Sequence, residues 1–186
     1  MDLKSSLSTI IKAYSEGFSL KTYGEESSES DLLMECFGIT QELKKENKQY
    51  WGRELGMCWQ LLVTKVFETN STTFQPALKI GLDEPADFIV GTEAVDTKYR
   101  VGSGDSGTLK KFKTYGGTIR NHGYEPVFLF LRTDNLPAAI TACRAGGWTL
   151  YTGETSFQFI NSRTGFDLKQ YLIDLKNSGT YIINRM

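Results

Sequence analysis

The chain has 186 residues, of which 40% are hydrophobic, and a formal net charge of −1. This length suits one ordinary domain with a hydrophobic core, and no apolar run is long enough for a membrane span. The first residues, MDLKSSLSTIIKAYSEGF, lack the apolar stretch of a signal peptide, so we expect a cytoplasmic protein. A nearly neutral chain also has no long-range attraction to nucleic acid as a whole.

The predicted elements alternate between helices and short strands. Apolar positions at helical spacing predict helices over residues 3–15, 40–67, 108–121, 136–147 and 155–177, the last broken near Gly165. Apolar and β-branched runs between turn signals predict strands over residues 77–82, 87–90, 94–100, 125–132, 148–153 and, as a short edge strand, 180–184. This order predicts an α/β fold with a mixed central sheet flanked by helices.

We expect a single domain in three parts: an N-terminal helix and acidic loop (1–39), a core (40–175) and a tail (176–186). The acidic segment GEESSESD, at residues 24–31, is typical of a solvated or mobile loop. In the long helix Thr40 is the expected cap. The apolar stripe expected on that helix consists of Leu55, Trp59, Leu62 and Val66.

Three cysteines and one histidine restrict the chemistry that the chain can carry. Cys36, Cys58 and Cys143 are far apart in sequence and form no CxxC pair, so a structural zinc site is not expected. A Ser-His-Asp or Cys-His site would have to use His122, in the segment RNHGYEP. Catalysis is therefore expected to rest on carboxylates, lysine and a hard metal ion.

The segment EPADFIVGTEAVDTKYR, at residues 84–100, holds two predicted strands joined by a connection of hairpin length. Because alternate side chains of a strand share a face, Asp96, Lys98 and Arg100 project together. Pairing of the strands brings Asp87 close to Asp96. Two adjacent carboxylates repel each other unless a cation lies between them, and Mg²⁺ takes one or two carboxylates together with water and phosphate. Lys98 would then orient or deprotonate a water molecule and stabilise charge on a phosphate.

The pattern acid-x-Lys is common in this chain and has little weight by itself. Five copies lie in predicted helical surroundings, where the charges form a solvated face: Asp2–Lys4, Glu42–Lys44, Glu46–Lys48, Asp167–Lys169 and Asp174–Lys176. Only Asp96–Lys98 lies in a predicted strand, after a Pro-x-Asp strand and before a basic helix.

The motif PAD at residues 85–87, followed by DTK at residues 96–98, resembles the signature of the PD-(D/E)xK nuclease superfamily, whose largest group is the Type II restriction endonucleases. The resemblance implies a restriction-endonuclease-like core and Mg²⁺-dependent hydrolysis of DNA phosphodiester bonds. It implies catalytic roles for Asp87, Asp96 and Lys98. An alanine here separates the proline from the acid, which leaves Asp83 and Glu84 as alternatives to Asp87.

Many members of the superfamily add an acid from a helix that precedes the hairpin. Glu54, in YWGRELGMCWQLL, is the residue expected in that catalytic role. The alternative is that Glu54 pairs with Arg53 or Lys65, or reaches solvent. The residues that the resemblance implies as metal ligands are Asp87, Asp96, Thr97 and Glu54.

Residues 98–122 contain six lysines and arginines and a single acid, Asp105. Such a local excess of positive charge is typical of contacts with DNA phosphates, which position a duplex without reading its sequence. The expected DNA-binding residues are Arg100, Lys110, Lys111 and Lys113. For the three lysines the alternative is a solvated helix face.

The whole chain most resembles the small catalytic subunit of a heterodimeric Type IIS restriction endonuclease. This resemblance implies double-stranded DNA as the substrate and a larger DNA-recognition subunit as the partner. Little chain remains outside the core to read base edges, which fits a cleavage-only subunit. The alternatives are a homodimer that reads a short palindrome, a non-catalytic subunit that holds DNA, and a nuclease acting on branched or damaged DNA.

Overall fold

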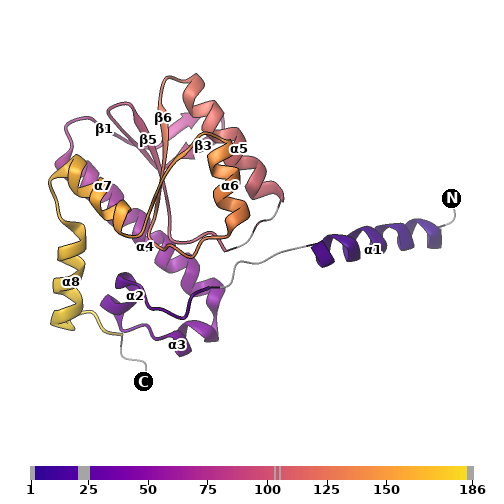
Figure 1. The fold of residues 1–186 in the computed structure, drawn as a ribbon, viewed down its shortest axis with the longest axis horizontal. Coiled ribbons are helices and arrows are strands. Elements are labelled where there is room, and N and C mark those ends of the chain that lie inside the picture. Colours follow the sequence, from indigo (N-terminus) through magenta and orange to yellow (C-terminus); the bar gives the residue numbers. More distant parts are fainter. Residues whose placement is uncertain (1–2, 21–25, 103, 105, 184–186) are drawn as a thin grey trace.

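The computed structural model describes residues 3–20, 26–102, 104 and 106–183. A mixed five-stranded sheet is flanked by helices (Figure 1), so the predicted α/β class is confirmed. The helices are α1 (Leu3–Leu20), α2 (Leu32–Phe37), α3 (Gln41–Glu46), α4 (Lys48–Asn70), α5 (Ser106–Asn121), α6 (Pro137–Ala145), α7 (Glu154–Thr164) and α8 (Leu168–Ser178). The strands are β1 (Phe74–Gln75), β2 (Leu78–Ile80), β3 (Asp83–Ala86), β4 (Phe88–Val90), β5 (Glu93–Lys98), β6 (Glu125–Phe130) and β7 (Thr149–Thr152).

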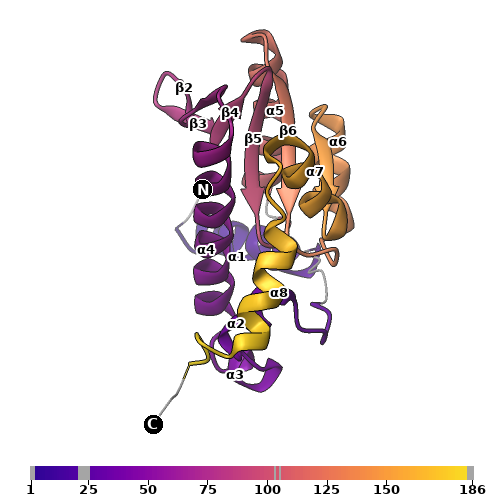
Figure 2. The same cartoon turned by 90° about the vertical axis from the view of Figure 1, so that its left-hand side faces the viewer.

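The main sheet has the strand order β1-β4-β5-β6-β7. β1 is antiparallel to β4, and β4 is antiparallel to β5. β5, β6 and β7 are parallel, and α5 and α6 connect them. Residues of α4 and α7 pack in the core on one face, and residues of α5 and α6 pack in the core on the other (Figure 2). β2 and β3 form a separate two-stranded sheet, in which the second strand was not predicted.

β4 and β5 form the predicted hairpin. Phe88 pairs with Val95 and Val90 pairs with Glu93, so the turn consists of Gly91 and Thr92. Gly91 has a φ of 57°, a conformation that glycine adopts without steric cost and that tight hairpin turns require. The turn therefore fixes the register that sets Asp87, just before β4, opposite Asp96 of β5 at the open end of the hairpin.

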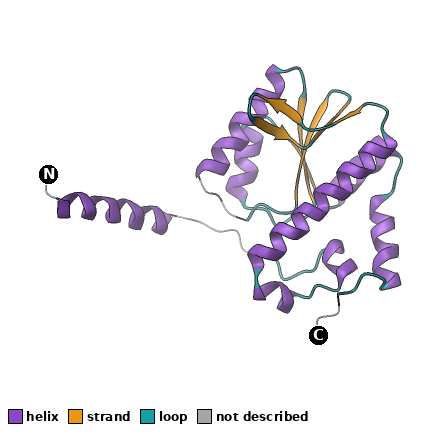
Figure 3. Ribbon diagram, turned by 180° about the vertical axis from the view of Figure 1, so that it is seen from behind, coloured by secondary structure: helices purple, strands orange, loops and turns teal. Residues whose placement is uncertain are grey.

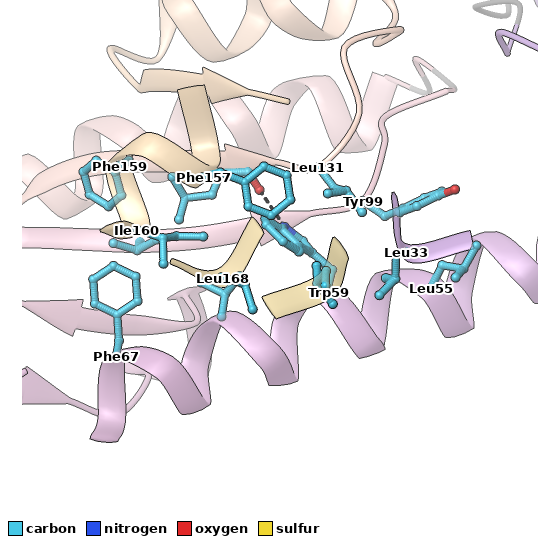
Figure 4. Packing of buried hydrophobic residues seen from close by; sticks show 14 of the residues in the cluster. Leu33, Leu55, Trp59, Phe67, Tyr99, Leu131, Phe157, Phe159, Ile160 and Leu168 are labelled. Carbon is cyan, nitrogen blue, oxygen red and sulfur yellow. Dashed lines mark hydrogen bonds between the residues drawn. The ribbon is translucent and has the colours of Figure 1, made fainter. Parts of the chain in front are cut away.

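The face of α4 that packs on the sheet is buried at every fourth residue, at Trp51, Leu55, Trp59, Val63 and Phe67. Trp59 lies at the centre of this core (Figure 4) and donates a hydrogen bond from Nε1 to the carbonyl oxygen of Leu129, at 3.2 Å. Its ring meets Phe157 edge-on, with 5.5 Å between the ring centroids. Of the predicted stripe, Leu55 and Trp59 belong to this buried seam, and Leu62 and Val66 are half-buried and pack against its edge.

The long helix predicted from residue 40 is two helices. Thr40 caps α3, as expected, by accepting a hydrogen bond from the Leu43 amide. Asn47 then has an extended φ of −153° and starts α4, because its side chain accepts a hydrogen bond from the Tyr50 amide. A side chain that satisfies a free amide in this way begins a new helix. The short helix α2 was not predicted.

The acidic segment before α2 is held against the body of the protein, and the prediction of a solvated loop is wrong for Glu26 and Asp31. Lys44 is only 2% exposed and contacts Glu26 Oε1 at 2.5 Å and Tyr99 Oη at 2.8 Å. Asp31 accepts hydrogen bonds from Tyr99 Oη and from Arg132 Nη1. Buried cations need anionic partners, and these acids supply them. Gly24 and Glu25 lie outside the described residues.

The predicted edge strand near the C-terminus is also wrong. Residues 180–183 form a turn and an irregular segment, and Asn184 lies outside the described residues. The Ile183 amide donates a single hydrogen bond to the carbonyl oxygen of Phe37. Within the described part of the chain, no helix is both long enough and apolar enough to cross a membrane.

α5 and α6 approach each other closely at two glycines. A Cβ atom on Gly116 would overlap the carbonyl oxygen of Gly146, and a Cβ atom on Gly146 would overlap the carbonyl oxygen of Phe112. Trp148 closes the same contact, since its Nε1 donates to Phe112 O at 2.7 Å and its ring stacks on Phe128 at 3.9 Å. Backbone atoms cannot move aside as side chains can. α5 and α6 can therefore pack this closely only because Gly116 and Gly146 have no side chain.

Gly116→Ala is expected to lower the free energy of unfolding by about 1–3 kcal/mol, because the added methyl group overpacks this contact. Urea denaturation measures the change. Gly117→Ala is the matched control, since a Cβ atom there meets nothing within 4 Å. That variant should be neutral or more stable by up to about 1 kcal/mol. Equal effects of the two substitutions would contradict the close approach of α5 and α6.

Candidate active site

The two acids of the hairpin motif lie side by side at the end of the β4–β5 pair. Asp87 lies in the bend between β3 and β4, and its amide donates a hydrogen bond to the carbonyl oxygen of Val95 at 2.8 Å. Since Phe88 pairs with Val95, the next position of the same register sets Asp87 opposite Asp96. The hairpin therefore brings two carboxyl groups, nine residues apart in sequence, to one place.

Hydrogen bonds hold both oxygens of the Asp87 carboxylate. Oδ2 accepts from the backbone amide and from the hydroxyl group of Thr97, each at 2.7 Å. Oδ1 accepts from Nε2 of Gln60 on α4, also at 2.7 Å. Three donors therefore orient this carboxylate and stabilise its negative charge.

Asp96 and Lys98 lie on the face of β5 that carries α5 and α6. Lys98 Nζ contacts Asp96 Oδ1 at 2.5 Å and donates to the carbonyl oxygen of Thr97 at 3.1 Å. It also lies 5.9 Å from the centroid of the Phe128 ring. The Asp96 side chain is 13% exposed and the Lys98 side chain 37% exposed, so the ammonium group can still be reached from outside.

Burial raises the pKa of Asp96 to about 7 from an ordinary 3.8; the charge of Lys98 opposes this shift, and the negative charge of Asp87 reinforces it. Burial alone would lower the pKa of Lys98, but the charges of Asp96 and Asp87 outweigh burial and raise it. Lys98 therefore stays protonated at neutral pH. A second cation beside the two carboxylates would favour the ionised form of Asp96.

Asp96 and Lys98 line a cavity of about 470 Å³. Arg100 and Lys111 bring two further cations to its wall, and the polar residues Thr108 and Tyr115 also line it. The strand alternation predicted that Asp96, Lys98 and Arg100 would share a face, and all three line this cavity. Glu84 adds a second acid to the wall, so the cavity combines two acids with three cations, and this excess of positive charge suits an anionic ligand.

The structure does not bring Glu54 to these residues. Glu54 is 45% exposed and pairs with Arg53 at 2.8 Å. Gln60 is the α4 residue that reaches Asp87. It lies six residues further along α4, which is about 9 Å along the axis and on a different side of the helix. A polar amide inside the apolar run CWQLLV was the sequence signal for this position.

The four basic residues expected to bind DNA do not share one environment in the structure. Arg100 is held by Asp134, since its Nε donates to the backbone carbonyl at 2.9 Å and to Oδ2 at 3.1 Å. Lys111 is exposed at the cavity wall. Lys110 and Lys113 are exposed on α5 and do not line the cavity.

The donor set suits a hard metal ion. Mg²⁺ is usually held by one or two carboxylates, with water and substrate phosphate completing its shell, so the Asp87–Asp96 pair is sufficient. Thr97 follows Asp96 in β5, and its carbonyl oxygen, which accepts a hydrogen bond from Lys98, is a third oxygen donor. No larger cluster of three or more His, Cys, Asp or Glu side chains that could hold a metal occurs among the residues that the structure describes.

Comparison with known proteins finds no matching family model, no matching curated protein and no matching solved structure. The function must therefore be inferred from the geometry of the cavity.

The raised pKa of Asp96 predicts how the free energy of unfolding depends on pH when no divalent ion is present. The folded-state pKa of about 7 exceeds the unfolded value, so the native state loses stability as pH rises from about 4 to about 7. Asp96→Asn removes this loss. The free energy of unfolding of the variant should therefore rise relative to that of the wild type across this pH range, by up to about 4 kcal/mol. Urea denaturation with EDTA present measures the difference, and a difference independent of pH would contradict the assignment.

Proposed function

We propose that the chain is a Mg²⁺-dependent DNA endonuclease of the PD-(D/E)xK type. The observation that carries the proposal is the meeting of Asp87, Asp96 and Lys98 at one end of a hairpin, beside a cavity with a cationic wall. The element order α4, β1, β4, β5, α5, β6 supports it, because it matches the helix, meander, helix and parallel strand of a restriction-endonuclease-like core.

Each residue has a role that follows from its surroundings. Asp87 and Asp96 would hold the ion, which supplies charge neutralisation at the phosphate and a more acidic bound water. Lys98 is a cation at neutral pH, so it orients a water molecule and stabilises negative charge, and it is not a general base. Thr97 and Gln60 orient the carboxylate of Asp87.

Arg100 and Lys111 would bind phosphates next to the scissile bond, because both line the cavity that holds Asp96. The Asp134 carboxylate and carbonyl fix the direction of the Arg100 side chain, which lowers the entropy cost of contacting DNA. Lys110 and Lys113 lie further out on α5 and would bind neighbouring phosphates.

The chain would act as the strand-cleaving subunit of a restriction endonuclease. A net charge of −1 and one local basic region favour recruitment to DNA by a larger recognition subunit over unaided binding. A homodimer that reads a short palindrome remains the alternative assembly.

The proposal is tested with purified chain, supercoiled plasmid and Mg²⁺, with and without the recognition subunit. Asp96→Ala and Lys98→Ala should each reduce cleavage by at least about 100-fold. Asp174→Ala is the control, because Asp174 belongs to an exposed acid-x-Lys copy on α8. A wild-type protein that cuts no faster than Asp96→Ala would refute the nuclease.

A non-catalytic subunit that holds DNA is the second possibility, and the direct contact of Lys98 with Asp96 favours it. In that case the acid serves only to neutralise the lysine. Binding of duplex DNA would then be unchanged by Asp96→Asn, and no variant would show Mg²⁺-dependent cleavage.

Gln60→Ala should weaken Mg²⁺ binding by about 10-fold or more, because residues that orient a metal ligand typically contribute that much to affinity. Titration calorimetry with Mg²⁺ measures the change. Thr64→Ala, one turn further along α4 and also half-buried, is the control and should bind Mg²⁺ like the wild type. Unchanged affinity in Gln60→Ala would show that Gln60 does not support the site.

A further inference from the structure

Arg100 reaches the cavity from a loop rather than from a strand or a helix. It follows the last residue of β5, and its side chain is only 11% exposed, whereas Lys111 is exposed on α5. Asp134, which holds Arg100, lies in the loop that follows β6. Since β5 and β6 are neighbouring parallel strands, both loops leave the same end of the sheet (Figure 3). The two loops therefore decide together where the arginine lies.

Gly102 lies against the guanidinium group of Arg100. A Cβ atom built on Gly102 would lie 2.1 Å from Nη1, 3.1 Å from Cζ and 3.6 Å from Nη2 of that arginine. Non-bonded heavy atoms of this kind normally stay about 3.5 Å apart or more. The guanidinium group therefore occupies the space that a side chain at residue 102 would fill.

The backbone of Gly102 does not itself require glycine. Its φ lies outside the left-handed region that other residues avoid. The three atoms nearest to the built Cβ atom all belong to the Arg100 guanidinium group. An alanine at this position would therefore disturb the arginine and leave the fold of the loop in place.

Asp134 holds the same guanidinium group at another atom. Arg100 donates from Nε to both the carbonyl oxygen and the carboxylate of Asp134, while Gly102 confines the Nη1 end. The guanidinium group is planar and its donors have fixed directions. A group held at Nε and confined at Nη1 is therefore restricted to a narrow range of orientations.

Asp134 cannot easily move aside. Its Oδ1 accepts from Nε of Arg132 at 2.8 Å, and its Oδ2 accepts from Nη2 of Arg132 at 3.1 Å and from the Ser27 amide at 2.7 Å. Arg132 is only 5% exposed and also bonds Asp31. Burial opposes ionisation of Asp134, but the hydrogen bonds from Arg132 and the Ser27 amide lower its pKa to about 2. A charged and fully bonded Asp134 therefore keeps Arg100 against Gly102.

We propose that Gly102 is a positioning residue for DNA cleavage, because its missing side chain lets the loop backbone and Asp134 hold the Arg100 guanidinium group ready for the phosphate next to the scissile bond. This inference rests on the proposed nuclease function. A donor that is fixed before the substrate binds loses less entropy on contact and is already aligned for the transition state. An arginine displaced by a methyl group would keep its charge and lose that alignment.

Gly102→Ala tests the proposal without changing the net charge. Where the wild type cleaves supercoiled plasmid with Mg²⁺, the variant should have a kcat/KM lower by about 10- to 100-fold, as expected for a lost hydrogen bond to a charged group. The slope of log kcat/KM against log salt concentration should become shallower by about 0.9, because one phosphate contact is lost. Gly52→Ala on α4 is the matched control and should cleave like the wild type, since a Cβ atom there meets nothing within 4 Å.

A double variant separates a role through Arg100 from a general effect on the loop. Arg100→Ala removes the group that the methyl group displaces, so adding Gly102→Ala to it should lower kcat/KM by no more than about 2-fold further. Two effects that multiply would show that Gly102 does not act through Arg100, and would overturn the proposal. Urea denaturation should give the wild-type midpoint for Gly102→Ala, because the atom that must move is the end of a flexible side chain.

The NMR signal of the Arg100 Nε–H group tests the geometry without cleavage. This signal, identified by its loss in Arg100→Ala, should exchange slowly with solvent in the wild type, since the group is buried and bonded to Asp134. In Gly102→Ala it should shift and exchange at least about 10-fold faster. An unchanged signal would show that the methyl group does not displace the arginine, and would overturn the proposal.

Failure of this inference and failure of the nuclease give different results. A wild type that cuts no faster than Asp96→Ala refutes the nuclease, and the role of Gly102 in cleavage with it. A wild type that cuts, together with a Gly102→Ala variant that cuts equally fast, refutes only the role of Gly102.

Discussion

β5 carries charged side chains into the middle of a sheet that is covered on both faces, and the rest of the structure is arranged around that constraint. Val95 and Tyr99 pack towards α4, while Asp96 and Lys98 face α5 and α6. A buried carboxylate is costly unless it is paired. Lys98 pairs with Asp96 directly, and the cavity beside them admits solvent or a ligand. The candidate site thus lies at the charged residues of β5, whose burial would be unfavourable without the Lys98–Asp96 pair and the cavity beside it.

A second group of buried charges lies just beyond the C-terminal end of β5, around Tyr99. Lys44 and Arg132 are almost fully buried, and each is neutralised by acids from distant parts of the chain. Asp134 bonds both Arg132 and Arg100, so the segment before α2 is connected to the cavity through Arg132 and Asp134. Among the described residues, every buried side-chain nitrogen and oxygen has a hydrogen-bond partner. This cluster therefore belongs to the framework that orients Arg100.

Much of the fold was predictable because its signals are local. The turn at Gly91, the alternation along β5 and the apolar run of β6 each specify structure within a few residues. The errors concern interactions between distant segments. A solvated loop was expected at residues 24–31 because the segment itself contains four acids and no base, yet Lys44 and Arg132 supply the bases in space. The Asn47 cap and the short helix α2 are local features that were missed because each involves only a few residues.

The sequence by itself determined the α/β class, the hairpin and the alternation that directs Asp96, Lys98 and Arg100 to one side, since strand periodicity and turn chemistry act over short distances. Only the tertiary structure decided which α4 residue meets Asp87, because the sequence contains both Glu54 and Gln60 and the helix packing selects between them. It also decided that Arg100 is held by Asp134 and lies against Gly102. Those outcomes depend on the angles and distances at which elements pack, which local residue patterns do not encode.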